Sequence, residues 1–114
     1  MTSNEVTANE ILRVVPYEKG FHFFSPDGHY TGETATNLCF LLRDIQRVDI
    51  ESIMFHFLRG DFQKWLRTTI GDEELANTID GIDKNVSDEN LLSQLHNVIE
   101  KRIMHLRLIK PRAE

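Results

Sequence analysis

The stretch that decides the fold is DIESIMFHFLRGDFQKWLRTTIGDEELA, residues 49–76. Its apolar residues recur every three or four positions, a spacing that predicts amphipathic helices. The dipeptide Gly-Asp occurs twice in it, at 60–61 and at 71–72. Glycine just after a helix adopts positive φ at little cost, and aspartate is a preferred N-cap. We therefore expect short helices joined by two tight Gly-Asp corners, with Asp61 and Asp72 as the caps.

A different pattern precedes this stretch. The run FHFF at residues 21–24 is aromatic and favours a β-strand. Residues 26–28, Pro-Asp-Gly, are a turn signal, and His-Tyr-Thr follows. The pattern predicts a small β-hairpin near residues 21–31. Since an isolated hairpin is marginally stable, we expect it to pack on the helices.

Polar residues mark where the other helices begin. Thr7 is expected to cap a short helix close to the N-terminus. Thr34 or Thr36 is expected to cap a helix that carries the apolar residues between 38 and 45. Ser87 is expected to cap a long C-terminal helix. The predicted fold class is therefore mainly α, with several short helices, the hairpin and one long terminal helix.

The length of the chain, 114 residues, fits one domain. Residues 1–6 are expected to be a flexible leader and residues 7–110 a single globular domain. Pro111 is expected to stop the last helix, which leaves residues 111–114 as a tail.

Composition excludes several classes of function. The formal net charge of −5 does not draw the chain to nucleic acid or to anionic membranes. The single cysteine, Cys39, allows no intrachain disulfide, and no stretch approaches the roughly 18 apolar residues of a membrane span. The first residues lack the pattern of a signal peptide. A cytoplasmic location is expected by elimination.

Histidine and aromatic side chains supply the candidate ligand-binding residues. Two histidines lie in Phe-His-Phe settings, and an aromatic set of this size can line a pocket. The alternative is that the same rings form the core. The candidate ligand-binding residues are His22, Tyr30, His56 and Trp65. The spacing of the histidines matches no zinc signature and no nucleophile motif is present, so we expect no metal, no cofactor and no catalytic residue.

The C-terminal helix supplies a candidate interaction surface. Its apolar band is wide enough to contact two surfaces at once. One side can cover the short helices, while Leu92, Ile99, Ile103 and Leu106 could meet a second copy, forming a homodimer, or another protein. The alternative is that the core of the same chain buries the whole band.

Several short motifs together resemble a small domain family of archaea and bacteria that is catalogued only as of unknown function. The resemblance covers about residues 20–83 and implies no activity, so no functional residue is carried over from it. The motifs are FHFF at 21–24, YTG at 30–32, DIES at 49–52, FHF at 55–57, RGDF at 59–62, Trp65, and GDEELA at 71–76.

The sequence thus favours a non-catalytic protein-interaction or regulatory module that binds a protein partner or itself. Two alternatives stay open: a small-ligand or sensory domain that uses the aromatic-histidine region, and a minimal enzyme with His22 or His56 as base beside Asp61. An enzyme predicts a histidine bonded to a carboxylate in a cleft. A ligand domain predicts an aromatic pocket with a few convergent polar groups.

Overall fold

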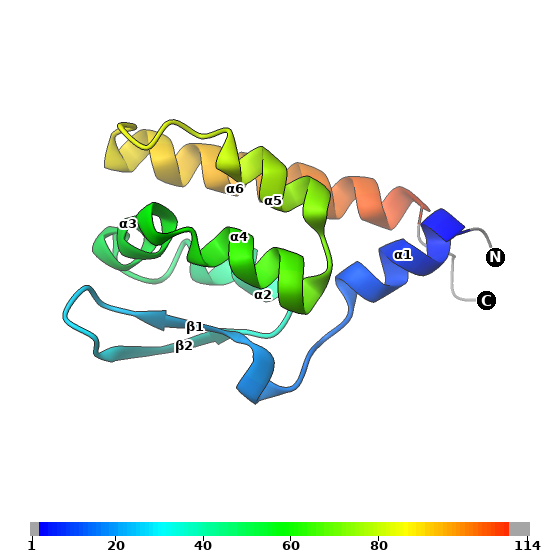
Figure 1. Ribbon diagram of the computed structural model, residues 1–114, viewed down its shortest axis with the longest axis horizontal. Coiled ribbons are helices and arrows are strands. Elements are labelled where there is room, and N and C mark those ends of the chain that lie inside the picture. The colour runs from blue at the N-terminus through cyan, green and yellow to red at the C-terminus, as the bar shows by residue number, and fades with distance from the viewer. Residues whose placement is uncertain (1–2, 110–114) are drawn as a thin grey trace.

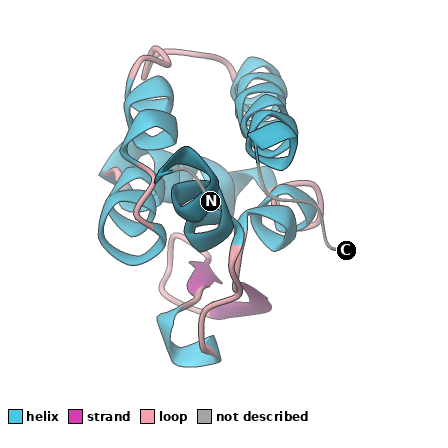
Figure 2. Ribbon diagram, turned by 90° about the vertical axis from the view of Figure 1, so that its right-hand side faces the viewer, coloured by secondary structure: helices cyan, strands magenta, loops and turns pink. Residues whose placement is uncertain are grey.

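In the computed structural model, which describes residues 3–109, a β-hairpin lies on one side of a layered set of helices (Figure 1). Figure 2 shows the same arrangement from the end, with both strands below the α-helices. The mainly α fold class is confirmed, with the hairpin and the long C-terminal helix. The elements are α1 (Ser3–Leu12), η1 (Tyr17–Lys19), β1 (Phe21–Phe24), β2 (Tyr30–Ala35), α2 (Leu38–Asp44), α3 (Ile50–Arg59), α4 (Asp61–Trp65), the π-helical turn η2 (Leu66–Ile70), α5 (Glu73–Asp80) and α6 (Asp88–Ile109).

Two predicted helix starts are wrong. Helix α1 begins at Ser3, so Thr7 lies inside it and the helix covers four of the residues expected in a leader. Helix α2 is capped by Asn37, whose side chain accepts a hydrogen bond from the backbone N–H of Phe40. Thr34 lies in β2 instead, because that strand pairs with β1 as far as Ala35. The pairing with β1 therefore displaces the start of α2 beyond both predicted threonines.

The hairpin turns one face inward. Phe21 and Phe23 are buried, while His22 is half-buried and Phe24 is exposed, as strand alternation requires. The strands pair antiparallel, with an irregular register between His22 and Phe24. Gly32 lies in β2 opposite this irregularity, with φ of 93°. The rings of Phe21 and Phe23 pack the hairpin against the helical core.

Helix α6 is the centre of the core. It packs against α1, α2, α3 and α5. Its buried residues are Leu91, Leu95, Ile99, Ile103 and Leu106. The predicted interaction surface is therefore wrong: Ile99, Ile103 and Leu106 are buried in the monomer, and Leu92 is half-buried. Short helices lie against both sides of α6 and cover the wide apolar band.

A buried ion pair ties α6 to the second Gly-Asp corner. Asp72 accepts a hydrogen bond from the N–H of Leu75, 3.1 Å away, so it is the N-cap of α5 as predicted. The guanidinium of Arg102 also donates to both of its carboxylate oxygens, at 2.9 and 3.1 Å. Asp72 is 1 % exposed. The sequence pattern predicted the cap but not the arginine thirty residues away.

Two expectations concern the ends of the chain and its helices. Ser87 caps α6, because its Oγ accepts from the N–H of Asn90. Pro111 and the expected tail lie outside the described residues. Between residues 3 and 109, no helix is long and apolar enough to cross a membrane.

Candidate functional site

The site begins at the corner between α3 and α4. Gly60 ends α3 with φ of 75°, and its N–H bonds to the carbonyl of Phe57. Asp61 was predicted to cap the next helix, and this is wrong: Asp61 is the first residue of α4 and its side chain makes no cap hydrogen bond. Its carboxylate turns back instead, and Oδ2 lies 2.8 Å from Nδ1 of His56.

Both ring nitrogens of His56 are engaged. Nε2 accepts the backbone N–H of Phe24 at 2.9 Å, so it carries no proton, and Nδ1–H donates to Asp61. His56 is 4 % exposed. Burial lowers the pKa of His56 below its ordinary value, and the carboxylate of Asp61 opposes this in part. The imidazole is therefore neutral at pH 7 and joins the α3–α4 corner to β1.

A second side chain of α3 binds the other backbone group of Phe24. Ser52 Oγ donates to the carbonyl oxygen of Phe24 at 2.7 Å. Both backbone groups of Phe24 therefore point toward α3 and away from β2. The side chains of Ser52 and His56 form a clamp on β1 at its C-terminal end.

Trp65 forms the matching clamp at the other end of β1. Its indole Nε1–H donates to the carbonyl oxygen of Lys19, 2.9 Å away, just before the strand begins. The ring packs edge-on against Phe21, with centroids 5.8 Å apart. Trp65 is 7 % exposed, so it is a core residue as well as part of the site.

The backbone of His22 lies between the two clamps and faces outward from the hairpin. In a strand, residues of the same parity direct N–H and C=O to the same edge. Phe24 directs both groups toward α3, so His22, two residues earlier, presents its own N–H and C=O on that edge. No hydrogen bond from a described side chain reaches either group. Strand β1 thus has an open edge one residue long.

A cavity of about 340 Å³ lies along this open edge, between β1 and the α3–α4 corner. One wall is the edge of the strand and the other is aromatic and charged. Its lining residues are Gly20, Phe21, His22, Phe24, Gly28, Phe55, His56, Arg59, Asp61 and Trp65. Of the four predicted ligand-binding residues, His22, His56 and Trp65 line it together.

Tyr30, the fourth predicted residue, lies beside the cavity. Its hydroxyl is 2.6 Å from Thr34 Oγ1, which is 2.8 Å from Nδ1 of His22. The hydroxyls of Tyr30 and Tyr17 are 3.0 Å apart. Tyr30 therefore orients the ring of His22 through Thr34, rather than lining the cavity itself.

A family model described as "Family of unknown function (DUF5752)" matches residues 1–101. The chain belongs to the DUF5752 family. The resemblance drawn from residues 20–83 is confirmed and extends into α6 and α1, where no motif had been recognised. Comparisons with curated proteins and with solved structures find no match.

Sequence reasoning missed several features of this DUF5752 site. Arg59 and Phe55 were not selected, although they are neighbours of the chosen His56 and Asp61. The guanidinium of Arg59 lies 4.7 Å from the centroid of the Phe55 ring, and its Nε is 3.4 Å from Asp61 Oδ2. The sequence had suggested the pair of His56 and Asp61 only as part of the enzyme alternative, and the two side chains do lie 2.8 Å apart. Nothing in the sequence indicated the open backbone edge at His22.

Within residues 3–109, no group of three or more His, Cys, Asp or Glu side chains is placed to hold an ion. The side chains in the lining supply aromatic walls, two imidazoles, one guanidinium and one carboxylate.

Proposed function

We propose that this domain is a non-catalytic protein-interaction module that binds an extended peptide segment of another protein at the open edge of β1. Addition of a strand to an exposed sheet edge is a common mode of peptide recognition, in which backbone hydrogen bonds supply affinity and pockets supply specificity. The observation that carries the proposal is the aromatic cavity along β1, on the edge of the strand to which alternation from Phe24 directs the N–H and C=O of His22.

The surroundings of the edge support this mode of binding. The cavity has room for a side chain of the incoming segment next to its backbone. Its walls, Phe21, Phe55 and Trp65, favour an apolar side chain, because burial of such a group against aromatic rings is favourable. The clamps at Lys19 and Phe24 hold the strand in place, so little ordering of the protein is needed on binding.

The hydrogen bonds of His56 argue against the enzyme alternative. His56 does bond to a carboxylate beside a cavity, as that alternative required. However, its only lone pair is occupied by the N–H of Phe24, so no atom is left to take a proton from a substrate. His22 lies against Thr34 and not against a carboxylate. Neither histidine has the arrangement of an activated base.

A small-molecule ligand is the second candidate, because a cavity of about 340 Å³ lies within the range of small-ligand pockets. The two candidate ligands differ in whether they need the backbone N–H of His22. A strand-like segment needs the N–H of His22 as a donor, whereas an aromatic ligand held between the walls of the cavity does not. A variant that removes only this donor separates them.

The experiment compares His22→Pro with His22→Ala. Proline removes the N–H that points to the open edge and is tolerated on edge strands, while alanine removes the same imidazole and keeps the N–H. The probes are N-acetyl-Ala-Ala-X peptides, where X is Val, Leu, Ile or Phe, each as free acid and as N-methylamide. Trp65 is the single tryptophan of the chain, so its indole N–H gives one NMR signal in every variant.

We expect at least one peptide to shift the indole signal of the wild type and of His22→Ala. We expect His22→Pro to bind that peptide about tenfold more weakly, because the incoming carbonyl loses its donor. If no peptide of the panel, as free acid or as N-methylamide, shifts the indole signal of Trp65 in the wild type, the proposal is contradicted. Equal binding by both variants would favour the small-molecule alternative.

A further inference from the structure

The open edge of β1 is too short for a chain that passes through it. On one side, the backbone groups of Phe24 are taken by His56 and Ser52. On the other side, the carbonyl of Lys19 is taken by Trp65. Between them, His22 has its N–H and C=O on this edge by alternation, and the N–H of Gly20 is taken by the carbonyl of Tyr17. A segment in the middle of a longer chain would pass both clamps, where β1 offers its backbone no partner, whereas a chain that ends at the site would pass only one.

A guanidinium stands at the cavity beside this edge. Arg59 lines the cavity, and its side chain is 60 % exposed. Its Nε is held by Asp61 and its plane lies over Phe55, which fixes the direction of the guanidinium. In the described part of the chain, no hydrogen bond uses its two terminal amino groups. This fork of two parallel donors matches the two oxygens of a carboxylate.

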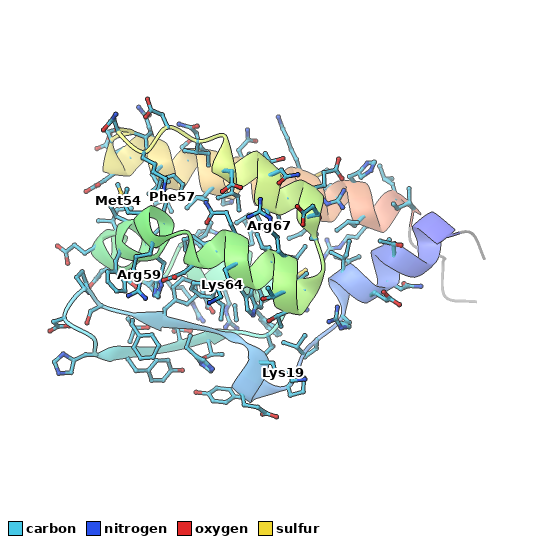
Figure 3. All side chains as sticks on the ribbon, in the orientation of Figure 1. Lys19, Met54, Phe57, Arg59, Lys64 and Arg67 are labelled. Carbon is cyan, nitrogen blue, oxygen red and sulfur yellow. The ribbon has the colours of Figure 1, made fainter. Side chains whose placement is uncertain are left out.

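Arg59 is the one lysine or arginine in the lining of the cavity, although the whole chain is acidic at −5. In Figure 3 the labelled side chains of Arg59 and Lys64 come from α3 and α4 on the side of the hairpin, and Lys19 lies in the segment that leads into β1. Both lysines are exposed, and neither forms an ion pair with another side chain that the structure describes. Asp61 is the one carboxylate in the lining, and it is already paired with Arg59 and His56.

Resting on the proposed function, we propose that the site is specific for the C-terminal residue of a partner protein. The terminal carboxylate binds the fork of Arg59. The residue before the last pairs its N–H and C=O with the C=O and N–H of His22. The final side chain, which is apolar, enters the cavity between Phe55 and Trp65. The recognised feature is thus a free carboxylate joined to an extended backbone and an apolar last residue.

The test measures the dissociation constants of matched peptides by NMR titration. Each N-acetyl-Ala-Ala-X free acid is compared with its N-methylamide, which keeps the backbone and the side chain but removes the negative charge. We expect the wild type to bind the free acid of the best peptide about ten- to a hundredfold more tightly, the range expected for a bidentate charge-assisted pair.

Two variants with the same change of charge assign this preference to one residue. Arg59→Gln removes the fork, while Arg47→Gln removes an exposed arginine that does not line the cavity. We expect Arg59→Gln to bind both forms equally and Arg47→Gln to keep the full preference. Arg59→Lys keeps the charge without the fork, so we expect it to keep part of the preference.

Each outcome bears on a different step. If the wild type binds the free acid and the methylamide equally, the C-terminal specificity is wrong, and the proposed peptide-binding function stands. If Arg59→Gln keeps the preference, the carboxylate is bound elsewhere and the assignment to Arg59 is overturned. If neither form binds, the proposed function itself fails. A thermal unfolding curve for each variant shows that a loss of binding is not a loss of fold.

Discussion

The two Gly-Asp corners share a dipeptide and a glycine with positive φ, but their aspartates act differently: Asp72 precedes its helix as the N-cap, while Asp61 is the first residue of α4. Gly60 and Gly71 both adopt positive φ, at 75° and 86°. At the second corner, Asp72 is buried, caps α5 and is bound by Arg102. At the first corner, Asp61 caps nothing and binds His56 and Arg59 beside a cavity.

The difference lies in what surrounds each corner. The long helix α6 passes the second corner and delivers an arginine into the core, so its aspartate is enclosed. The hairpin lies beside the first corner, and a histidine on α3 reaches across to it. One corner therefore stabilises the fold, while the other connects the fold to the proposed binding edge.

The largest expected effect is at the second corner. Asp72→Ala removes the cap of α5 and leaves the guanidinium of Arg102, whose side chain is 13 % exposed, without its buried partner. We expect a loss of about 3 kcal/mol in the free energy of unfolding, measured with urea. Asp72→Asn keeps an N-cap acceptor but no charge, so its loss should be smaller. A loss under about 1 kcal/mol for the alanine variant would show that the pair with Arg102 adds nothing beyond the cap.

The glycines test what the corners share. An added Cβ would have open space at both positions, since its nearest neighbour is 4.0 Å away at Gly60 and none lies within 4 Å at Gly71. The cost of Gly60→Ala and of Gly71→Ala is therefore the strain of positive φ alone, about 1–2 kcal/mol each. Thermal or urea unfolding of both variants should give nearly equal losses. If the two losses in the free energy of unfolding differ widely, the backbone at one corner can shift to accommodate alanine and the backbone at the other cannot.

Asp61→Ala should be milder than Asp72→Ala. It leaves Nδ1–H of His56 without its acceptor, but the side chain of Asp61 is 26 % exposed and water can replace it. We expect a loss of about 1 kcal/mol in the free energy of unfolding, together with weaker peptide binding, because Arg59 loses the carboxylate that orients it. Asp61→Asn, which keeps an acceptor, is the control. If Asp61→Ala destabilises the domain as much as Asp72→Ala, the contrast between the corners is false.

The smallest expected effect is a dependence of stability on pH that comes from the first corner. Burial lowers the pKa of His56 below 6.5, so the unfolded chain takes up this proton more readily than the folded one. The stabilising contribution is complete above about pH 6.5 and is lost as the pH falls below that value. His56→Gln should show a shallower loss between pH 7 and pH 5 in urea unfolding. His29→Gln, at a side chain that is 83 % exposed, should keep the wild-type profile.

The sequence predicted many of the residues that form the site, but not how they are placed relative to one another. The aromatic and histidine pattern selected His22, His56 and Trp65, which do meet at one cavity. The sequence could not show that β1 has an open edge, because backbone direction depends on which strand and which helix lie on each side. It also could not show that Asp61 leaves its own helix to bind His56.

The sequence by itself determined the features that depend on near neighbours: the short helices, the hairpin, the positive φ of Gly60 and Gly71, and the caps at Asp72 and Ser87. These follow from periodicity, turn residues and hydrogen bonds within about four residues. Only the tertiary structure decided that Ile99, Ile103 and Leu106 of α6 are buried in the monomer and where the carboxylate of Asp61 goes. Both outcomes depend on elements that are distant in sequence, and a local pattern contains no information about which of them will pack against it.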